Sequence, residues 1–222
     1  LKQIVAERAV ADNVKDGMVV GLGTGSTAYY VIKKVGELVS QGMDITCVTT
    51  SEQTERIALE CGIKVVPVED VEAVDVTIDG ADEVDPQMNL IKGLGGALLR
   101  EKIVAAASVK EIIVVDESKL VEKLGTRCPL PVEVLKCGHT HTAYALGRQG
   151  CEPVLRMKDG EPFITDSGNY IYDCGFPGID SAFFVESRLD VIPGVVENGL
   201  FLNMVYAVYV SHADGSVTVM ER

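Results

Sequence analysis

IDGADEVDPQMNLIKGLGGALLREK, residues 78–102, is the stretch that decides how this chain is organised. It begins at the end of an apolar run, residues 74–78, which predicts a buried strand, and it closes in a run with helical spacing. Between the two lie an acidic loop, a lysine and a glycine cluster. Open α/β sheets bind ligands at the carboxyl ends of their strands, where Asp79 would lie. The stretch therefore predicts an α/β fold with a ligand site directly after this strand.

Apolar runs and helical patterns alternate through the first half of the chain. Alternation of this kind indicates a Rossmann-like, mostly parallel sheet flanked by helices. The helix expected at 97–108 would bury Leu98, Ile103 and Ala106, and Thr50 and Gln53 have the spacing of a capping box. The expected strands are 18–22, 45–49, 63–66, 74–78 and 111–115, and the expected helices are 3–14, 28–39, 50–62 and 97–108.

The rhythm changes after Lys123, and Pro129 and Pro131 mark a boundary. The following short strands and helices, in the order βαβββα, predict a smaller, ferredoxin-like α+β domain over residues 128–197. Two further apolar runs, 200–210 and 216–220, are separated by a turn, and we expect them to return to the first sheet as edge strands. The Rossmann-like catalytic domain would then comprise residues 1–127 and 198–222.

Composition narrows the class of partner. The formal net charge is −13, which argues against binding to nucleic acid or to an anionic membrane, because both attract basic surfaces. No apolar run approaches the roughly 18 residues of a membrane span, and no signal peptide is visible. The six cysteines form no C-x-x-C pair, as is typical of reduced thiols. We therefore expect a cytoplasmic protein.

The loop G23-T-G-S-T27 lies between an expected strand and an expected helix. Backbone N–H groups at a helix N-terminus, with the hydroxyls of Thr24, Ser26 and Thr27, suit a phosphate group. A tight turn with Ser26 or Thr27 as the N-cap is the alternative. A Walker loop is excluded because it has no lysine here, and the glycine spacing differs from that of a dinucleotide site. A sugar phosphate or mononucleotide fits better than NAD.

The acidic loop D79-G-A-D82-E-V-D85 has three possible interpretations. It could be a solvated turn, or it could hold a divalent cation, although the spacing of an EF-hand is absent. Alternatively, its carboxylates perform acid/base chemistry on sugar hydroxyls. The residues that follow favour this third interpretation, because Lys92 could neutralise an oxyanion and a nearby glycine cluster would let a substrate approach the backbone.

Three further features do not by themselves predict a function. Glu101 lies in an R-E-K cluster on a helix, where it could be a general base or an ordinary surface glutamate. Lys119 follows a strand and could reach an anionic ligand or lie solvated in its loop. The pattern C137-G-H-T-H141 lacks a fourth ligand at a suitable spacing for a metal.

Taken in order, these motifs resemble ribose-5-phosphate isomerase of the A type. The resemblance spans essentially the whole chain, and the combination of the acidic and glycine-rich segments is the most specific part. The matching segments are GTGSTA (23–28), TTSEQT (49–54), DGADEVD (79–85), KGLGGALLREK (92–102), DESK (116–119), CPLPVEV (128–134) and PGVVENGLF (193–201).

The resemblance implies interconversion of D-ribose 5-phosphate and D-ribulose 5-phosphate without a metal or organic cofactor. The proton-shuttling glutamate of the family falls on Glu101, ring opening falls on Asp79 or Asp82, and Lys92 is implied to stabilise the enediolate. Lys2 could match an N-terminal lysine of some members. The implied substrate-binding residues are Thr24, Gly25, Ser26, Thr27, Asp79, Gly80, Ala81, Asp82, Lys92, Gly93, Leu94, Gly95 and Lys119.

Two other functions share this architecture. A non-catalytic sugar-phosphate sensor of a repressor would carry a basic helix-turn-helix, which this chain lacks. A CoA-transferase-like enzyme would use a glutamate nucleophile and a CoA pocket. The resemblance also implies a homodimer or homotetramer, plausibly formed through the small domain.

Overall fold

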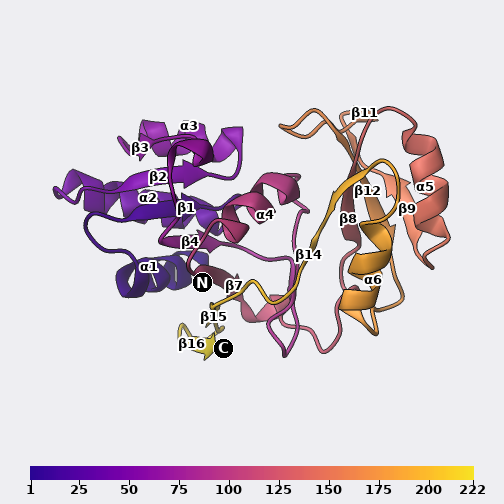
Figure 1. The fold of residues 1–222 in the computed structure, drawn as a ribbon. Helices are drawn as coiled ribbons and strands as arrows, with labels where there is room; N and C mark the ends of the chain where they lie inside the picture. Colours follow the sequence, from indigo (N-terminus) through magenta and orange to yellow (C-terminus); the bar gives the residue numbers. More distant parts are fainter. The chain divides into compact units, whose positions relative to one another are not determined.

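A computed structural model describes all residues from 1 to 222 and divides the chain into two compact units. Unit 1 comprises residues 1–81, 100–119 and 204–222, and unit 2 comprises residues 82–99 and 120–203 (Figure 1). The small domain expected at 128–197 falls in unit 2, together with segments 82–99, 120–127 and 198–203, which were expected in the larger domain. No helix in the structure is long and apolar enough to cross a membrane.

Unit 1 is built on a seven-stranded sheet with the strand order β16-β15-β7-β4-β1-β2-β3. All neighbouring strands are parallel except β15 and β16, which form an antiparallel hairpin. The expected Rossmann-like sheet is therefore confirmed. Its elements are α1 (Lys2–Asn13), β1 (Val19–Leu22), α2 (Ala28–Ser40), β2 (Thr46–Thr49), α3 (Glu52–Glu60), β3 (Lys64–Val65), η1 (Val68–Asp70), β4 (Val76–Asp79), α4 (Leu98–Ala106, which begins in unit 2), β7 (Glu111–Asp116), η2 (Glu117–Lys119), β15 (Ala207–Ser211) and β16 (Val217–Glu221).

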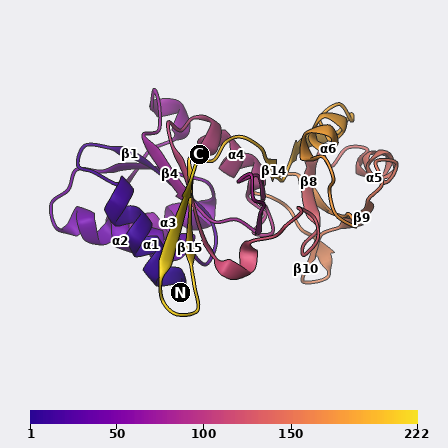
Figure 2. The ribbon, with the colours of Figure 1, turned by 90° about the horizontal axis from the view of Figure 1, so that it is seen from below.

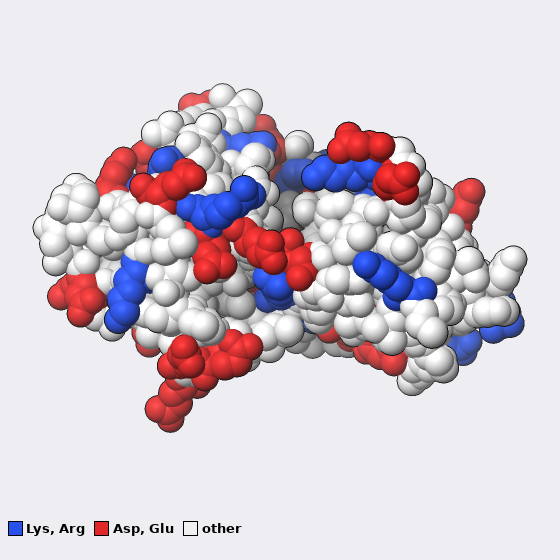
Figure 3. Space-filling model, turned by 90° about the horizontal axis from the view of Figure 1, so that it is seen from above, with Lys and Arg blue, Asp and Glu red and all other residues white.

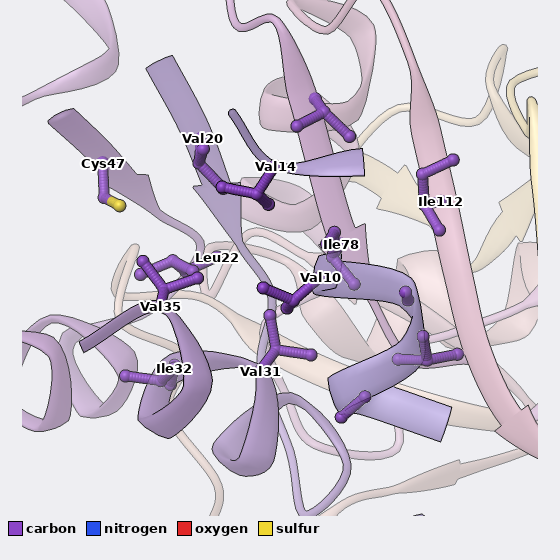
Figure 4. Packing of buried hydrophobic residues seen from close by; sticks show 14 of the residues in the cluster. Val10, Val14, Val20, Leu22, Val31, Ile32, Val35, Cys47, Ile78 and Ile112 are labelled. Carbon is purple, nitrogen blue, oxygen red and sulfur yellow. The ribbon is translucent and has the colours of Figure 1, made fainter. Parts of the chain in front are cut away.

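Alternate residues of the central strands face opposite layers of helices, as the two-residue period of a strand requires. Leu22 of β1 lies beside Val35 of α2 (Figure 4), and Val20 belongs to the same core, which α1 and α2 share with the sheet. Gly21, between them, faces α4, which packs on the other side of the sheet. Unit 1 therefore has helices on both faces of the sheet.

The C-terminal hairpin of β15 and β16, yellow in Figure 2, lies beside α1. The Tyr209 hydroxyl of β15 donates a hydrogen bond to Asp12 at 3.2 Å and accepts one from Asn13 at 3.0 Å. The structure corrects the expected assignment of this region in two ways. Of these two strands only β16 lies at an edge of the sheet, since β15 pairs with β7 as well as with β16. The apolar run 200–210 is not one strand, because Leu200–Phe201 pairs with β6 of unit 2.

Unit 2 contains a four-stranded antiparallel sheet in the order β13-β8-β12-β9, covered by two helices. Taken along the chain, these elements follow the βαββαβ order of a ferredoxin-like fold. The ferredoxin-like class was expected, but the expected order was βαβββα, which lacks the strand that follows α6. A three-stranded sheet β14-β6-β5 and a small hairpin β10-β11 complete the unit. The elements are β5 (Glu83–Val84), β6 (Leu90–Ile91), β8 (Leu130–Val134), α5 (His139–Gly147), β9 (Glu152–Leu155), β10 (Met157–Lys158), β11 (Glu161–Pro162), β12 (Tyr170–Gly175), α6 (Ala182–Leu189), β13 (Val195–Asn198) and β14 (Leu200–Phe201).

Two local details differ from expectation. The N-cap of α3 is Ser51, whose hydroxyl accepts a hydrogen bond from Thr54 N–H, and not Thr50. The buried face of α4 carries Glu101, because Leu98 and Val104 are buried on either side of it, whereas Ile103 is 49% exposed. The helix therefore faces the sheet with a carboxylate on its inner side.

Charged side chains are mixed over the face shown in Figure 3, where lysine and arginine stand among aspartate and glutamate and large uncharged areas. This face carries no continuous basic surface of the kind that binds a nucleic acid backbone.

Candidate active site

The loop Gly23–Thr27 connects β1 to α2 and presents backbone donors. The N–H groups of Gly25, Ser26 and Thr27 make no hydrogen bond within the chain. Thr27 is the N-cap of α2, and its side chain makes no capping bond. Unsatisfied N–H groups at a helix N-terminus attract anions, because they add to the positive end of the helix dipole. The loop can therefore bind a phosphate through its backbone.

A lysine from α1 reaches this loop. Lys2 Nζ donates a hydrogen bond to Ser26 Oγ at 2.7 Å. Both side chains are exposed, so the ammonium group is held at Ser26 and remains accessible to a ligand. Lys2 is therefore in contact with the loop.

The Thr24 hydroxyl points toward the start of α3. It lies 2.7 Å from the hydroxyl of Thr50, 2.8 Å from that of Ser51 and 3.2 Å from that of Thr54. This hydroxyl cluster fixes the loop against the neighbouring helix. The T-T-S-E-Q-T segment thus supports the loop, a role that local sequence reasoning did not assign to it.

Asp79 ends β4, next to β1 in the sheet. Its Oδ1 accepts hydrogen bonds from Thr24 N–H at 3.0 Å and from Gly80 N–H at 2.7 Å. The residue is 1% exposed. A Cβ at Gly23 would lie 2.0 Å from Asp79 Oδ1, so only glycine fits there. The chain continues from β1 to β2 on one side of β1, whereas β4 lies on its other side. The gap between the carboxyl ends of β1 and β4 is therefore the switch point where open α/β sheets bind ligands.

A second lysine, Lys119, lies just after the end of β7 in unit 1. The Ser118 hydroxyl and N–H, both hydrogen-bonded to the Asp116 carboxylate, lower the pKa of Asp116, and the charges of Lys119 and Lys2 act in the same direction. Lys119 ends η2, directly after β7, so it lies at the carboxyl ends of the strands, the edge of the sheet that carries the loop after β1.

Glu101 lies in the first turn of α4 and is 4% exposed. Val104, three residues later, packs over Gly21, and the helix ends near the start of β4, where Val109 N–H bonds to Val74 O. The helix therefore runs from the carboxyl ends of the strands toward their amino ends. Since each residue advances a helix by about 1.5 Å, Glu101 lies one turn nearer to the carboxyl ends, the edge that carries Asp79.

The lysine and the glycine turn lie in unit 2. Lys92 follows β6, is 2% exposed, and has its ammonium 5.4 Å from the centre of the Phe201 ring. The next four residues form a turn in which Gly96 N–H bonds to Gly93 O at 3.0 Å. Asp82 Oδ2 accepts a hydrogen bond from Leu94 N–H at 2.9 Å. Asp82 and the turn are thus brought together within this unit.

Two acids of the acidic loop have structural roles that the sequence did not reveal. Glu83 is fully buried and accepts backbone hydrogen bonds from Gly125, Arg127 and Cys128 at 2.6–2.9 Å. Asp85 accepts bonds from its own turn, at Gln87 and Asn89. The idea of a solvated turn is therefore wrong for these two acids.

No group of three or more histidine, cysteine, aspartate or glutamate residues is placed to hold a metal ion. His139, from the C-x-H-x-H pattern, instead makes a hydrogen bond with the Tyr172 hydroxyl at 2.8 Å. All six cysteines are free thiols, and Cys47 and Cys174 are buried.

A cavity of about 300 Å³ opens between α2 and α3, beside the loop. Neither Asp79 nor Glu101 contributes to its wall, so it borders the anion site without containing the carboxylates. It is lined by Gly25, Ser26, Tyr29, Ile32, Gln53, Thr54 and Ile57.

Known proteins match this chain over nearly its whole length. Residues 46–215 match the family model of ribose 5-phosphate isomerase A. A protein of Gloeobacter violaceus named ribose-5-phosphate isomerase A is 53% identical over 97% of this chain and 94% of its own length. The solved ribose 5-phosphate isomerase of Plasmodium falciparum is 41% identical, with a TM-score of 0.97 over 100% of this chain and 97% of that one. A D-ribose-5-phosphate isomerase solved with phospho-erythronic acid is 43% identical, with a TM-score of 0.96 over 100% and 97%.

Proposed function

The chain belongs to the ribose 5-phosphate isomerase A family and is an isomerase that interconverts D-ribose 5-phosphate and D-ribulose 5-phosphate, and we propose that Glu101 is the group that moves the proton. The reaction transfers a proton between C2 and C1 of the open-chain sugar through an enediolate. One carboxylate that reaches both carbons can remove the proton from one and return it to the other. The cis-enediolate then needs donors for its two oxygens.

The burial of Glu101 is the observation that carries this proposal. A carboxylate that is 4% exposed, on the inner face of a helix, is expensive to maintain unless it has a task or partners. An ordinary surface glutamate would have pointed outward with Ile103. The position of α4 over β1 directs Glu101 to the edge of the sheet where the anion loop begins.

The phosphate group is assigned to the loop after β1. The three N–H groups of Gly25, Ser26 and Thr27 supply directional donors, and Lys2 and Lys119 supply charge. Holding the phosphate anchors one end of a five-carbon chain, which turns proton transfer at the other end into an intramolecular event.

Ring opening is assigned to Asp82 in preference to Asp79. Asp79 is 1% exposed and its Oδ1 already holds two backbone N–H groups. Asp82 is half-buried and uses only Oδ2, for Leu94 N–H, so that Oδ1 is available to a sugar hydroxyl. Asp79 then holds the phosphate loop in place through its hydrogen bond with Thr24 N–H. Gly80 and Ala81 connect Asp79 to Asp82.

Stabilisation of the enediolate is assigned to Lys92 and to the backbone of Gly93, Leu94 and Gly95. A buried ammonium and oriented N–H groups stabilise an oxyanion strongly, because little reorganisation is needed when the charge develops. No cofactor has a role in these steps.

Glu101→Gln tests the proposal. The amide preserves size and hydrogen bonding but cannot take up a proton, so kcat should fall by about 10²–10⁴-fold while the melting temperature stays close to that of the unmodified chain. Glu55→Gln, an exposed carboxylate on α3, is the matched control. Formation of ribulose 5-phosphate is measured with EDTA present. A Glu101→Gln chain with near-normal kcat would remove Glu101 from the reaction.

Exposed aromatic side chains and free thiols bear on the assembly and the location of the chain. We propose a homodimer or homotetramer formed through unit 2, because Tyr144, Phe183 and Phe184 are 72%, 52% and 62% exposed there. Light scattering after size exclusion would refute this by returning a monomer of 23.8 kDa.

We also propose a cytoplasmic location, which suits six free thiols. Fractionation of cells tests this location.

A further inference from the structure

The glycine turn after Lys92 is fastened by a residue more than sixty positions away. Arg156 Nη1 donates hydrogen bonds to Gly93 O at 2.8 Å and to Leu94 O at 3.2 Å. All of these groups belong to unit 2. One guanidinium nitrogen therefore holds two consecutive carbonyl groups of the turn.

Arg156 is itself fixed by a carboxylate on the neighbouring strand. Its Nε and Nη2 bond to the two oxygens of Asp173 on β12, at 2.9 Å and 2.5 Å. The two side chains are 13% and 22% exposed. A bidentate pair of this kind sets the plane of the guanidinium group and leaves Nη1 to point at the turn.

Phe163 adds a second contact from the same part of the fold. Its N–H donates a hydrogen bond to Arg156 O at 2.9 Å, and the Arg156 guanidinium lies 5.9 Å from the centre of its ring. A Cβ at Gly96 would lie 2.5 Å from Phe163 Cζ, so this glycine packs directly on the ring. The segment between β9 and β12 therefore holds both ends of the turn.

The contact at Leu94 O has a chemical consequence. This oxygen belongs to the same peptide group as Gly95 N–H, which donates no hydrogen bond within the chain and is exposed. A cation bonded to the oxygen of a peptide group makes the N–H of that group a stronger donor, because hydrogen bonds in a chain polarise one another. Arg156 therefore both aims and strengthens the Gly95 N–H.

We infer that Arg156, oriented by Asp173, is a positioning residue that holds the Gly93–Gly96 turn so that Gly95 N–H donates to the enediolate oxygen of the substrate. The inference rests on the proposed function, in which this turn binds that oxygen. It assigns the ferredoxin-like sheet a part in the reaction, since Asp173 lies on β12 and Arg156 directly follows β9.

Arg156→Met is the principal test, with Arg148→Met as the matched control, because Arg148 is an exposed arginine of the same unit without a side-chain contact to the turn. A donor that acts mainly on the developing charge affects kcat more than KM. We expect kcat of Arg156→Met to fall by about 10- to 100-fold, with KM within about threefold and inhibition by inorganic phosphate unchanged.

Four further measurements separate positioning from general support of the fold. Arg156→Lys keeps the charge, but an ammonium cannot bridge a carboxylate and two carbonyl groups in this geometry, so its kcat should also fall. Asp173→Asn should lower kcat to a similar extent, and the double variant should fall little further, since the residues act as one unit. Free guanidinium at millimolar concentration should restore part of the kcat of Arg156→Ala.

Unaltered kcat in folded Arg156→Met and Asp173→Asn would overturn the inference. If Arg156→Met does not fold, Arg156→Lys and Asp173→Asn decide, and normal kcat in both has the same meaning. A loss of kcat that is accompanied by a fall in melting temperature and is not rescued by guanidinium would also refute positioning. A complete lack of turnover in the unmodified chain would instead refute the isomerase itself.

Discussion

Replacing Gly23 by alanine should damage both stability and activity, because this position is where β1 comes closest to the carboxylate of Asp79. The new Cβ would lie 2.0 Å from Asp79 Oδ1, 2.1 Å from its Cγ and 2.6 Å from its Cα. Contacts below about 3 Å are not tolerated, so the carboxylate must retreat by about 1 Å. The backbone contact at Cα prevents a simple rotation of the side chain from relieving the clash.

The magnitude follows from what the carboxylate holds. A retreat of about 1 Å takes Oδ1 out of reach of Thr24 N–H, now at 3.0 Å, and strains the bond from Gly80 N–H at 2.7 Å. Hydrogen bonds to charged groups contribute about 1.5–3 kcal/mol each, so we expect a loss of about 3–5 kcal/mol. For a chain of this size each kcal/mol lowers the melting temperature by about 2–4 °C, which gives a fall of about 6–20 °C.

Activity should fall further than stability alone explains. The Thr24 N–H that loses its acceptor begins the phosphate loop, so kcat/KM for ribose 5-phosphate should decrease by about 10²-fold or more. Gly80→Ala is the control for stability, because its Cβ would meet only Val114 O at 3.9 Å. A Gly23→Ala chain that melts within 2 °C of the unmodified chain, with normal kcat/KM, would refute this account of the β1–β4 gap.

Two further changes probe the cations and the carboxylate near this loop. Lys2→Met removes the ammonium at Ser26 and should raise KM about tenfold with little change in kcat, an effect that weakens at high salt; steady-state kinetics beside the exposed Lys33→Met tests this, and a loss confined to kcat would contradict it. Asp116 has its pKa lowered by the Ser118 hydrogen bonds and by Lys119 and Lys2. A carboxyl group with a lowered pKa stabilises the fold above its unfolded value of about 4 and loses this effect as the pH falls through the folded value. Asp116→Asn should therefore lower the free energy of unfolding in urea at pH 7, with a deficit that shrinks between pH 5 and pH 3; a constant deficit would show that its origin is not the charge.

The sheet of unit 1 was predictable because its determinants are local. Runs of valine and isoleucine separated by helical spacing specify alternation of strands and helices, and alternation specifies parallel pairing. The ferredoxin-like class of unit 2 followed from the same kind of pattern, but the order of its elements did not, since β13 was not expected. Prediction failed for the run 200–210, whose first part pairs with β6 and whose last part pairs with β7. Nothing in the run itself records two distant partners.

The candidate site was partly predictable from the sequence, and the predictions that failed have a common cause. Sequence patterns count polar residues as outward-facing, so Ile103 was expected on the inner face of α4 where Glu101 lies. Arg156 gave no signal at all, because its contacts with Gly93 and Leu94 arise only when the β9–β12 pairing is formed. Residues that act through long-range contacts cannot be found from local spacing.

The acidic loop shows why a dense motif is ambiguous when only its letters are known. Glu83 receives three backbone N–H groups and Asp85 receives two, together with the Asn89 amide. A carboxylate surrounded by donors of its own chain is stabilised as an anion and is held in place, so neither residue can turn toward a substrate without leaving those N–H groups unpaired. The same loop therefore encodes two tasks. The buried acids fix the backbone at Gly125–Cys128 and at the Asp85 turn, and that rigidity determines where Asp82 stands when it meets the glycine turn.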